Sequence, residues 1–318
     1  MMKKNISQCM IVKNEEKNIR RALSWGKDIM CEQIVVDTGS SDRTVEIARE
    51  MGAKIFFFPW INDFAAAKNF AIDQAKGDWI AFLDADESFT PEDAAKIPEI
   101  LEYVGDDVDG LLTGIADLDE NNNITSGGTM IRFFVNRPDL RYVGKIHEHL
   151  VRKGRSGLHL TDATKQLAFL HTGYQEQEKK DKSKFERNLN IILEILKQDP
   201  ENCDYLGYLG DTYSSDGKNE EARKAYQKAV AAMPEKLEVY DQRSSYTYTN
   251  LLRVSQCLNA LEAEVEAIYK EAVEKLPKEP DFDCVMGDWY WRKGQYEKAV
   301  QMYELAIAKL ETYGTVNR

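Results

Sequence analysis

Short apolar segments alternate with amphipathic segments through the first half of the chain. The apolar segments are residues 6–12, 33–36, 53–58 and 79–83. Apolar side chains at consecutive positions are typical of strands that are buried on both faces of a parallel sheet. The intervening segments have apolar residues at helical spacing and lie in 14–27, 42–52 and 63–75. This alternation predicts an α/β fold with right-handed crossovers.

A second group of strands is expected after a helix over residues 91–103. The candidate strands are less regular and lie in 110–117, 130–135 and 165–171. Because they do not alternate with helices, they predict a mixed sheet in which further strands extend the parallel part.

The second half of the chain has almost no strand signals. Small residues, aromatic residues and a proline recur in residues 203–236 and 280–313 at the spacing of tetratricopeptide repeats, with a divergent copy at 246–279. Three stacked repeats are about the minimum for a self-supporting array, and their aromatic side chains are mostly packing residues. We therefore expect an α/β domain at 1–175 and an all-α repeat domain at 176–318.

Composition narrows the classes of function. The 318 residues carry 54 acidic and 42 basic side chains, and this net charge of −12 argues against a nucleic-acid partner. The five cysteines are scattered and include no Cys-x-x-Cys pair, which indicates reduced thiols and no zinc site. No signal peptide and no apolar run of about 18 residues is recognisable, so we expect a cytoplasmic protein without a membrane span.

Acidic residues follow several of the predicted strands. Asp84 and Asp86 come directly after the strand at 79–83, and Asp37 follows the second strand. The carboxyl ends of parallel strands meet at one edge of a sheet, where α/β folds bind their ligands. Asp84 and Asp86 would point to the same side if the extended backbone continued through Ala85. Glu87 is expected only as the polar exit of this loop.

This edge has the chemistry of a metal site. One Asp-x-Asp pair alone is more often an acidic turn. The first strand, however, also ends in polar residues, at 13–16, and three such strand ends at one edge are hard to explain by solubility. Carboxylate oxygens suit Mg²⁺ or Mn²⁺ bound to a phosphorylated ligand. The chain has neither a dinucleotide-binding glycine fingerprint nor a P-loop, so metal is expected to hold the phosphates.

The blocks at 12–16, 34–44 and 77–87 resemble the conserved blocks of bacterial family 2 glycosyltransferases of GT-A fold, in the branch with C-terminal tetratricopeptide repeats. The resemblance covers about residues 6 to 190. It implies an inverting transferase that uses a nucleotide-sugar donor, usually linked to UDP, and Mn²⁺ or Mg²⁺.

The resemblance also implies roles for donor-binding residues. Asp37 would hydrogen-bond the nucleobase of the donor, and Asn14 and Glu15 would line the nucleoside pocket. Lys68 stands where family members usually have arginine and would contact the nucleobase. Asp84 would lie on the sugar or ribose side of the Asp-x-Asp motif.

Four further residues match the family's catalytic and metal positions. Asp86 would bind the metal, and His171 would complete the metal shell. Glu148 would be the catalytic base, because displacement at the anomeric carbon requires removal of the acceptor's proton. His147 would orient Glu148 or contact donor phosphate. The candidate diphosphate partners are Arg132, Arg137 and Arg187.

The acceptor is less constrained. Tetratricopeptide grooves bind extended peptides, and the resemblance extends to peptide S- and O-glycosyltransferases of bacteriocin clusters, so we favour a peptide or protein acceptor. A second interpretation is a transferase for lipopolysaccharide-core or other surface glycans, with the repeats forming a homodimer. Two interpretations from other classes are a nucleotidyltransferase, which would need a phosphate loop that residues 10–19 lack, and a non-catalytic repeat scaffold with a degenerate transferase half.

Overall fold

The computed structural model describes residues 4–172, 182–238 and 241–314. Contacts within the chain divide it into two compact units, Met1–Asp181 and Lys182–Arg318. The boundary expected between residues 175 and 176 falls outside the described residues. Within the described ranges, none of the helices has the length and apolar character that crossing a membrane would require.

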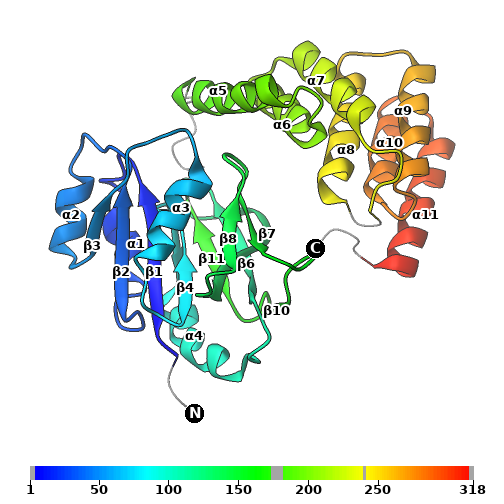
Figure 1. The fold of residues 1–318 in the computed structure, drawn as a ribbon. Coiled ribbons are helices and arrows are strands. Elements are labelled where there is room, and N and C mark those ends of the chain that lie inside the picture. Colours follow the sequence, from blue (N-terminus) through cyan, green and yellow to red (C-terminus); the bar gives the residue numbers. More distant parts are fainter. Residues whose placement is uncertain (1–3, 173–181, 239–240, 315–318) are drawn as a thin grey trace. The chain divides into compact units, whose positions relative to one another are not determined.

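The first unit is built on a mixed nine-stranded sheet with the strand order β3-β2-β1-β4-β7-β6-β11-β5 and with β10 beside β6 (Figure 1). Its strands are β1 (Ile6–Val12), β2 (Glu32–Asp37), β3 (Lys54–Phe57), β4 (Trp79–Phe82), β5 (Glu87–Phe89), β6 (Gly110–Leu118), β7 (Ile124–Val135), β10 (Leu160–Asp162) and β11 (Ala168–His171). Strands β8 (Leu140–Val143) and β9 (His149–Arg152) form a separate hairpin. Strands β1 to β4 pair in parallel and β7 is antiparallel to β4, so the predicted mixed sheet is confirmed.

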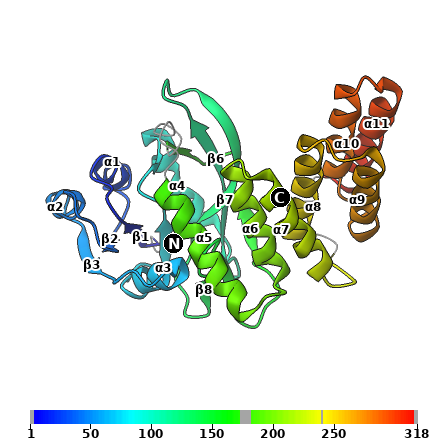
Figure 2. The same ribbon diagram turned by 90° about the horizontal axis from the view of Figure 1, so that it is seen from above.

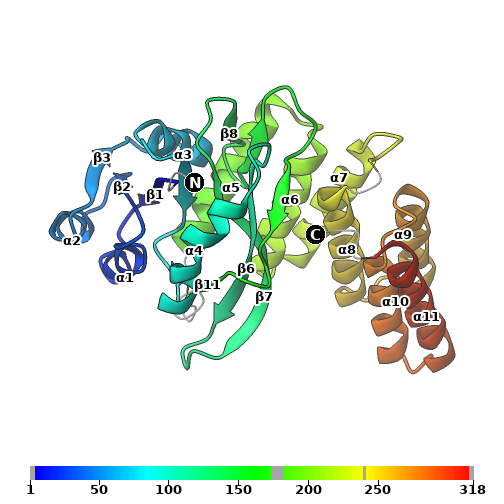
Figure 3. The ribbon, with the colours of Figure 1, turned by 90° about the horizontal axis from the view of Figure 1, so that it is seen from below.

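Helices cover both faces of the sheet (Figure 3). They are α1 (Ile19–Ser24), α2 (Thr44–Glu50), α3 (Phe64–Asp73) and α4 (Pro91–Tyr103). Along β4, Trp79 and Ala81 pack in the core beneath α4, whereas Ile80 and Phe82 pack in the core beneath α3. Burial on both faces explains why the strand is apolar at every position.

Two local predictions were wrong. The first helix is only Ile19–Ser24, because Asn14 has a φ of 58° and residues 15–18 form a turn before the helix starts. The extended backbone does not continue through Ala85, since β4 ends at Phe82 and the chain turns. The period of two therefore does not relate Asp84 to Asp86.

The second unit consists of helices only among its described residues (Figure 2). After α5 (Lys182–Gln198), three helix pairs follow: α6 (Cys203–Ser215) with α7 (Asn219–Ala232), α8 (Gln242–Cys257) with α9 (Glu262–Lys275), and α10 (Asp281–Arg292) with α11 (Tyr296–Tyr313). A Cβ atom on Gly210 would lie 2.4 Å from the Tyr226 ring, and one on Gly287 would lie 2.6 Å from the Tyr303 ring. Small residues are therefore needed where the helices of a pair touch.

Candidate active site

The parallel strands bring several predicted site residues to one edge of the sheet. In the register of β1, Val12 pairs with Asp37 of β2, and Cys9 pairs with Phe82 of β4. All three strands run in the same direction, so their carboxyl ends share one edge. Asn14 and Asp84 follow β1 and β4 by two residues each.

The residues expected at the nucleoside hold the loop after β2. The Asp37 carboxylate is buried and accepts backbone hydrogen bonds from that loop at 3.0 to 3.1 Å. Asn14 Oδ1 accepts a backbone hydrogen bond from the same loop at 2.8 Å, and Glu15 N donates to Thr44 Oγ1 at 2.7 Å. Side-chain acceptors of this kind fix the conformation of a loop. Their hydrogen bonds therefore give the strand ends a defined shape.

A buried arginine holds the first carboxylate of the Asp-x-Asp pair. Arg132 Nη2 lies 3.3 Å from Asp84 Oδ2 and also donates to Glu87, while the guanidinium packs on the Phe169 ring. Glu87 Oε2 in turn accepts from Asp84 N at 3.0 Å. Only 2% of Glu87 is exposed, so the expectation that it is merely a polar loop exit was wrong.

The charges around this cluster change its proton affinities. Burial, with the nearby Asp84 charge, raises the pKa of Glu87 to about 7 despite the opposing effect of Arg132. Partial loss of hydration opposes ionisation of Asp84, but the positive charges of Lys68 and Arg132 outweigh it and lower the pKa of Asp84. Asp84 is therefore held as a carboxylate at the sheet edge.

A second buried cation contacts Glu148, the candidate catalytic base. Lys68 on α3 is 5% exposed, and its Nζ lies 2.7 Å from Glu148 Oε1 and over the rings of Phe82 and Tyr142. Burial opposes the charge on Lys68, but the carboxylates of Asp84 and Glu148 outweigh it and raise the pKa of Lys68. Lys68 is thus positioned beside the candidate catalytic base, Glu148.

The loop that carries Glu148 is tied to the start of α3. Phe64 N donates to Lys145 O at 2.8 Å, and Asn69 exchanges two hydrogen bonds with the Tyr142 backbone. His147 is exposed and has a left-handed backbone conformation, with a φ of 55°. These contacts fix the direction in which the loop enters the site.

The second carboxylate of the motif meets the predicted metal-ligand histidine. Asp86 Oδ2 lies 3.3 Å from His171 Nε2, and His171 Nδ1 lies 2.8 Å from Asp117 Oδ1. Hydrogen bonding to Asp86 and Asp117 raises the pKa of His171 to about 9 although burial acts the other way. The described structure thus holds an imidazolium between two carboxylates.

The chemistry of this pair fits a divalent cation. A metal-bound histidine commonly has its other ring nitrogen held by a carboxylate, as Asp117 holds His171 here. A metal would take the place of the proton on His171 Nε2. Among the described residues no group of three or more His, Cys, Asp or Glu side chains forms a complete metal cage. The remaining ligands would be phosphate and water, as is usual for Mg²⁺.

Of the other two candidate arginines, Arg137 does not join this group, and Arg187 belongs to the second unit. Arg137 bonds Asp139, and it follows β7 at the end that pairs with Trp79, the start of β4. This position is at the opposite edge from Asp84. Arg187 lies in α5 of the second unit, where it donates to Asn188 Oδ1 at 3.0 Å.

The site includes acidic residues that sequence reasoning missed. Asp117 is the second-last residue of β6 and pairs in register with His171 of the parallel strand β11. Both strands were expected to end in these polar residues, so pairing the two strands would have found the contact. Glu87 carried no such signal, because its burial depends on Arg132 from a distant strand.

The first unit combines a mixed sheet with an Asp-x-Asp pair, a histidine and an acid–lysine pair at one edge, and a family match identifies it as a glycosyltransferase domain. Residues 7–154 match the model of Glycosyl transferase family 2, and residues 205–235 and 285–314 match models of the tetratricopeptide repeat. The chain therefore carries a family 2 glycosyltransferase domain followed by tetratricopeptide repeats.

Of two similar curated proteins, one is named for its TPR repeats and the other as a glycosyltransferase. The chain is 32% identical over 225 residues to a TPR repeat-containing protein of Synechococcus elongatus, which covers 69% of this chain and 55% of that protein. It is 32% identical over 226 residues to the SPbeta prophage-derived glycosyltransferase SunS of Bacillus subtilis. That alignment covers 70% of this chain and 52% of SunS. The chain thus spans about half the length of these relatives.

Among solved structures, the crystal structure of S. aureus TarS 1-349 is similar over 91% of this chain and 92% of that chain. The sequence identity is 14% and the TM-score is 0.44.

Proposed function

We propose that this protein is an inverting, metal-dependent glycosyltransferase that uses a UDP-linked sugar. One observation carries the proposal: Asp84 joins the charged groups of the sheet edge into one cluster. It bonds Arg132, it lies two residues before Asp86, and its charge raises the pKa of Lys68. A cluster that combines carboxylates with buried cations suits a metal and a diphosphate together.

Asp86 and His171 would hold the Mn²⁺ or Mg²⁺, with Asp117 orienting the imidazole. A bound divalent cation would supply positive charge for the diphosphate. Asp37, Asn14 and Glu15 would form the nucleoside side of the site through the loop that they stabilise.

Glu148 is proposed as the base. Lys68 Nζ engages Oε1, so Oε2 is the oxygen that would take the proton from the acceptor hydroxyl or thiol. The acceptor oxygen or sulfur then bonds to the anomeric carbon from the face opposite the diphosphate. The bond from the anomeric carbon to the phosphate oxygen breaks in the same step, and its electron pair leaves with the nucleoside diphosphate. His147 adjoins Glu148 and is proposed to help position it or the donor.

The proposed acceptor is a peptide or protein side chain that the repeats recruit. The three helix pairs α6/α7, α8/α9 and α10/α11 support this part, since such arrays present extended surfaces to peptides. All five cysteines are free thiols, which agrees with a cytoplasmic setting.

One observation favours a second candidate, a surface-glycan transferase that forms a homodimer. Helix α11 exposes apolar side chains at Val300, Ile307 and Leu310, which are 38% to 55% exposed. Burial of such a face against a second copy would be favourable. Light scattering of the purified chain measures its mass in solution and so distinguishes a dimer from a monomer.

The test is incubation with a panel of nucleotide sugars with and without Mn²⁺ or Mg²⁺. We expect one UDP-sugar to be hydrolysed slowly and to raise the melting temperature only when metal is present. A donor effect that is the same in EDTA would contradict the metal-dependent reaction.

A further inference from the structure

One edge of β7 has no strand beside it over much of its length. In the described sheet β7 lies between β4 and β6, but β4 pairs only with residues 133–135 and ends at Phe82. A register shift makes Arg132 the extra residue of a β-bulge, and the part of β7 before it pairs with β6 alone. Figure 2 and Figure 3 show that this hairpin extends beyond the other strands of the first unit, and residues 124–130 are exposed.

The hydrogen bonds of β6 show which main-chain groups of β7 point outward. Gly114 N of β6 donates to Leu167 O at 2.9 Å, so Gly114 faces away from β7. Successive residues of a strand direct their main-chain groups to opposite edges, so Thr113 faces β7, where its hydroxyl also donates to Met130 O at 2.8 Å. Every second residue of β7 before Met130 therefore bonds β6. The residues between them point outward, and in the described ranges no hydrogen bond reaches the main chain of Gly127 and Thr129.

This edge lacks the features that usually protect a free strand edge. Protected edges are short, or they carry charged residues or proline. The strands β3, β5 and β10, which also pair on one side only in the described sheet, are four, three and three residues long. Residues 124–131 include no charged residue and no proline, although 30% of the chain is charged. A long, uncharged free edge favours pairing with another strand.

Both ends of the free edge adjoin residues that contact the candidate active site. Ser126 Oγ donates to Asp117, the carboxylate that holds His171. Arg132, just after the free part, lies 3.3 Å from Asp84. A segment paired with β7 between Ser126 and Arg132 would therefore run past the carboxylates proposed to hold the metal and the donor.

We propose that the free edge of β7 binds an extended peptide segment as an additional strand, through the main chain of Gly127 and Thr129. The outward N–H and C=O groups repeat every two residues, about 7 Å apart, and another extended main chain has the same repeat. Binding itself requires neither donor nor metal. The further statement that this segment carries the sugar-accepting side chain rests on the proposed function.

The test is fluorescence anisotropy with the full chain, in the absence of nucleotide sugar and metal. The first probe is the uncharged, labelled peptide GTVSVTG with an amidated C-terminus. The second has the same sequence with N-methyl groups on its five central residues, which remove the N–H groups from both of its edges. Because strand addition depends on main-chain hydrogen bonds, we expect the first peptide to bind at least tenfold more tightly.

A pair of variants locates the binding on β7. Thr129→Pro removes an outward N–H group but leaves the ladder to β6 intact, and proline is tolerated at such edge positions. It should weaken binding of the unmethylated peptide at least tenfold. Thr129→Val, the matched control, keeps the N–H group and a side chain of the same shape and should bind like the wild type. Melting curves check that both variants fold, and the methylated peptide tests the same bonds without changing the protein.

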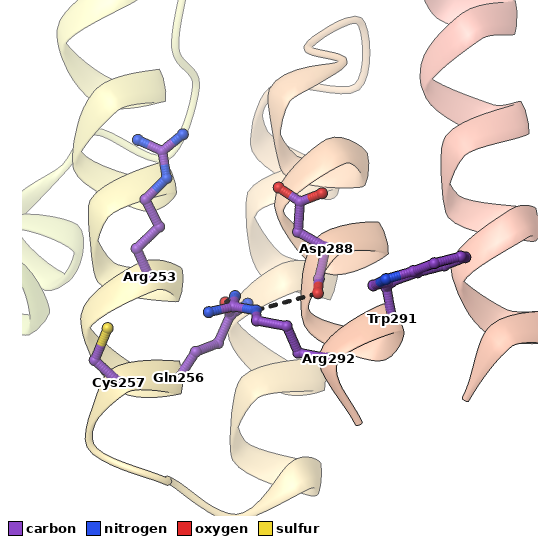
Figure 4. A pocket seen from close by; sticks show the side chains of 6 residues that line it. All are labelled: Arg253, Gln256, Cys257, Asp288, Trp291 and Arg292. Carbon is purple, nitrogen blue, oxygen red and sulfur yellow. Dashed lines mark hydrogen bonds between the residues drawn. The ribbon is translucent and has the colours of Figure 1, made fainter. Parts of the chain in front are cut away.

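A third variant separates the edge of β7 from the repeats. Figure 4 shows a pocket of the helical unit lined by side chains of α8 and α10, among them Arg253 and Trp291. Trp291→Ala alters this pocket and should leave binding of the peptide unchanged. A loss as large as that with Thr129→Pro would place the peptide on the repeats and contradict the inference.

Three further outcomes would overturn it. One is equal affinity for the methylated and unmethylated peptides or for the two Thr129 variants, and another is no binding up to about 1 mM peptide, which corresponds to a very weak complex. The third is a dimer of the wild type in light scattering that Thr129→Pro converts to a monomer, because a second copy would then occupy the edge. Since no transfer is measured, each result is independent of whether the first unit transfers sugar.

Discussion

Both units of this chain bury charged side chains, but they use them differently. In the first unit, buried Arg132 and Glu87 hold Asp84, whose side chain is 42% exposed. In the helical unit, buried Asp283 of α10 accepts the Tyr269 hydroxyl of α9 and pairs with Lys309 of α11, each at 2.6 Å. The first arrangement positions an accessible carboxylate, whereas the second joins three neighbouring helices.

This difference shows how a buried charge is to be interpreted. Burying an ion pair costs desolvation energy, so the pair alone is weak evidence of a stabilising role. A buried pair that holds an exposed, ionised group at a strand end indicates a site. A buried pair whose neighbours are all packed helices indicates structural cross-linking.

The largest expected effect is that of Glu148→Gln. The amide keeps an oxygen for Lys68 but cannot accept the acceptor's proton, so turnover should fall about 10²- to 10⁴-fold. Donor affinity, measured by calorimetry, should stay within a few fold of wild type. Glu304→Gln, the same change at an exposed position of α11, is the control. A wild-type rate for Glu148→Gln would place the base elsewhere.

Glu87→Gln and Asp283→Asn test the comparison directly. Each removes the negative partner of a cation in a buried pair, and each should lower the free energy of unfolding by about 3–5 kcal/mol when measured above pH 7, where Glu87 is ionised. Only Glu87→Gln should also raise the donor KM, by about tenfold, because Asp84 loses its support. Urea unfolding and steady-state kinetics at matched folded fraction measure both. Equal kinetic effects would remove the distinction between the two units.

Gly287→Ala should affect the helical unit alone. The added Cβ would lie 2.6 Å from the Tyr303 ring, and such overpacking costs about 1–3 kcal/mol. We expect a lower melting temperature and unchanged binding of UDP. Gly210→Ala is the matched variant in the first repeat, because its Cβ would lie 2.4 Å from the Tyr226 ring, and it should behave alike. Loss of UDP binding in either variant would show that the two units do not act separately.

The smallest effect concerns Glu262 on the surface of the repeats. Hydrogen bonds from Lys293 and Lys298 lower the pKa of Glu262 to about 2, from an ordinary 4.5. A lowered pKa in the folded state stabilises the protein above the unfolded pKa, and this contribution is lost as the pH falls from 4.5 towards 2. The difference in melting temperature between wild type and Glu262→Gln should therefore shrink over this interval. A difference that is independent of pH would contradict the assignment.

Much of the fold could be predicted from the sequence because the order of apolar residues indicates which positions are buried. Strand β1 matches the expected residues 6–12, and both faces of β4 are covered as its apolar sequence requires. Gly210 and Gly287 recur because each contacts an aromatic ring of the next helix. Local sequence carries these signals directly.

The parts that could not be predicted depend on partners distant in the chain. The turn at Ala85 and the burial of Glu87 involve Arg132, which lies 45 residues beyond Glu87. The support of His171 by Asp117 requires knowledge that β6 and β11 are parallel neighbours. Trp291 of α10 is 55% exposed, and an aromatic repeat pattern does not reveal this, because exposure depends on how the helices pack.

The most direct test of the account is a thermal-shift titration of UDP with and without Mn²⁺, for the wild-type chain and for Asp86→Ala. We expect UDP at about 100 times its Kd to stabilise the wild type by about 2.7 kcal/mol when Mn²⁺ is present, with a much smaller effect in EDTA. Asp86→Ala should melt like the wild type without ligand and lose the Mn²⁺-dependent part of the shift. A full shift in Asp86→Ala, or one that EDTA leaves unchanged in the wild type, would contradict the metal site at Asp86 and His171.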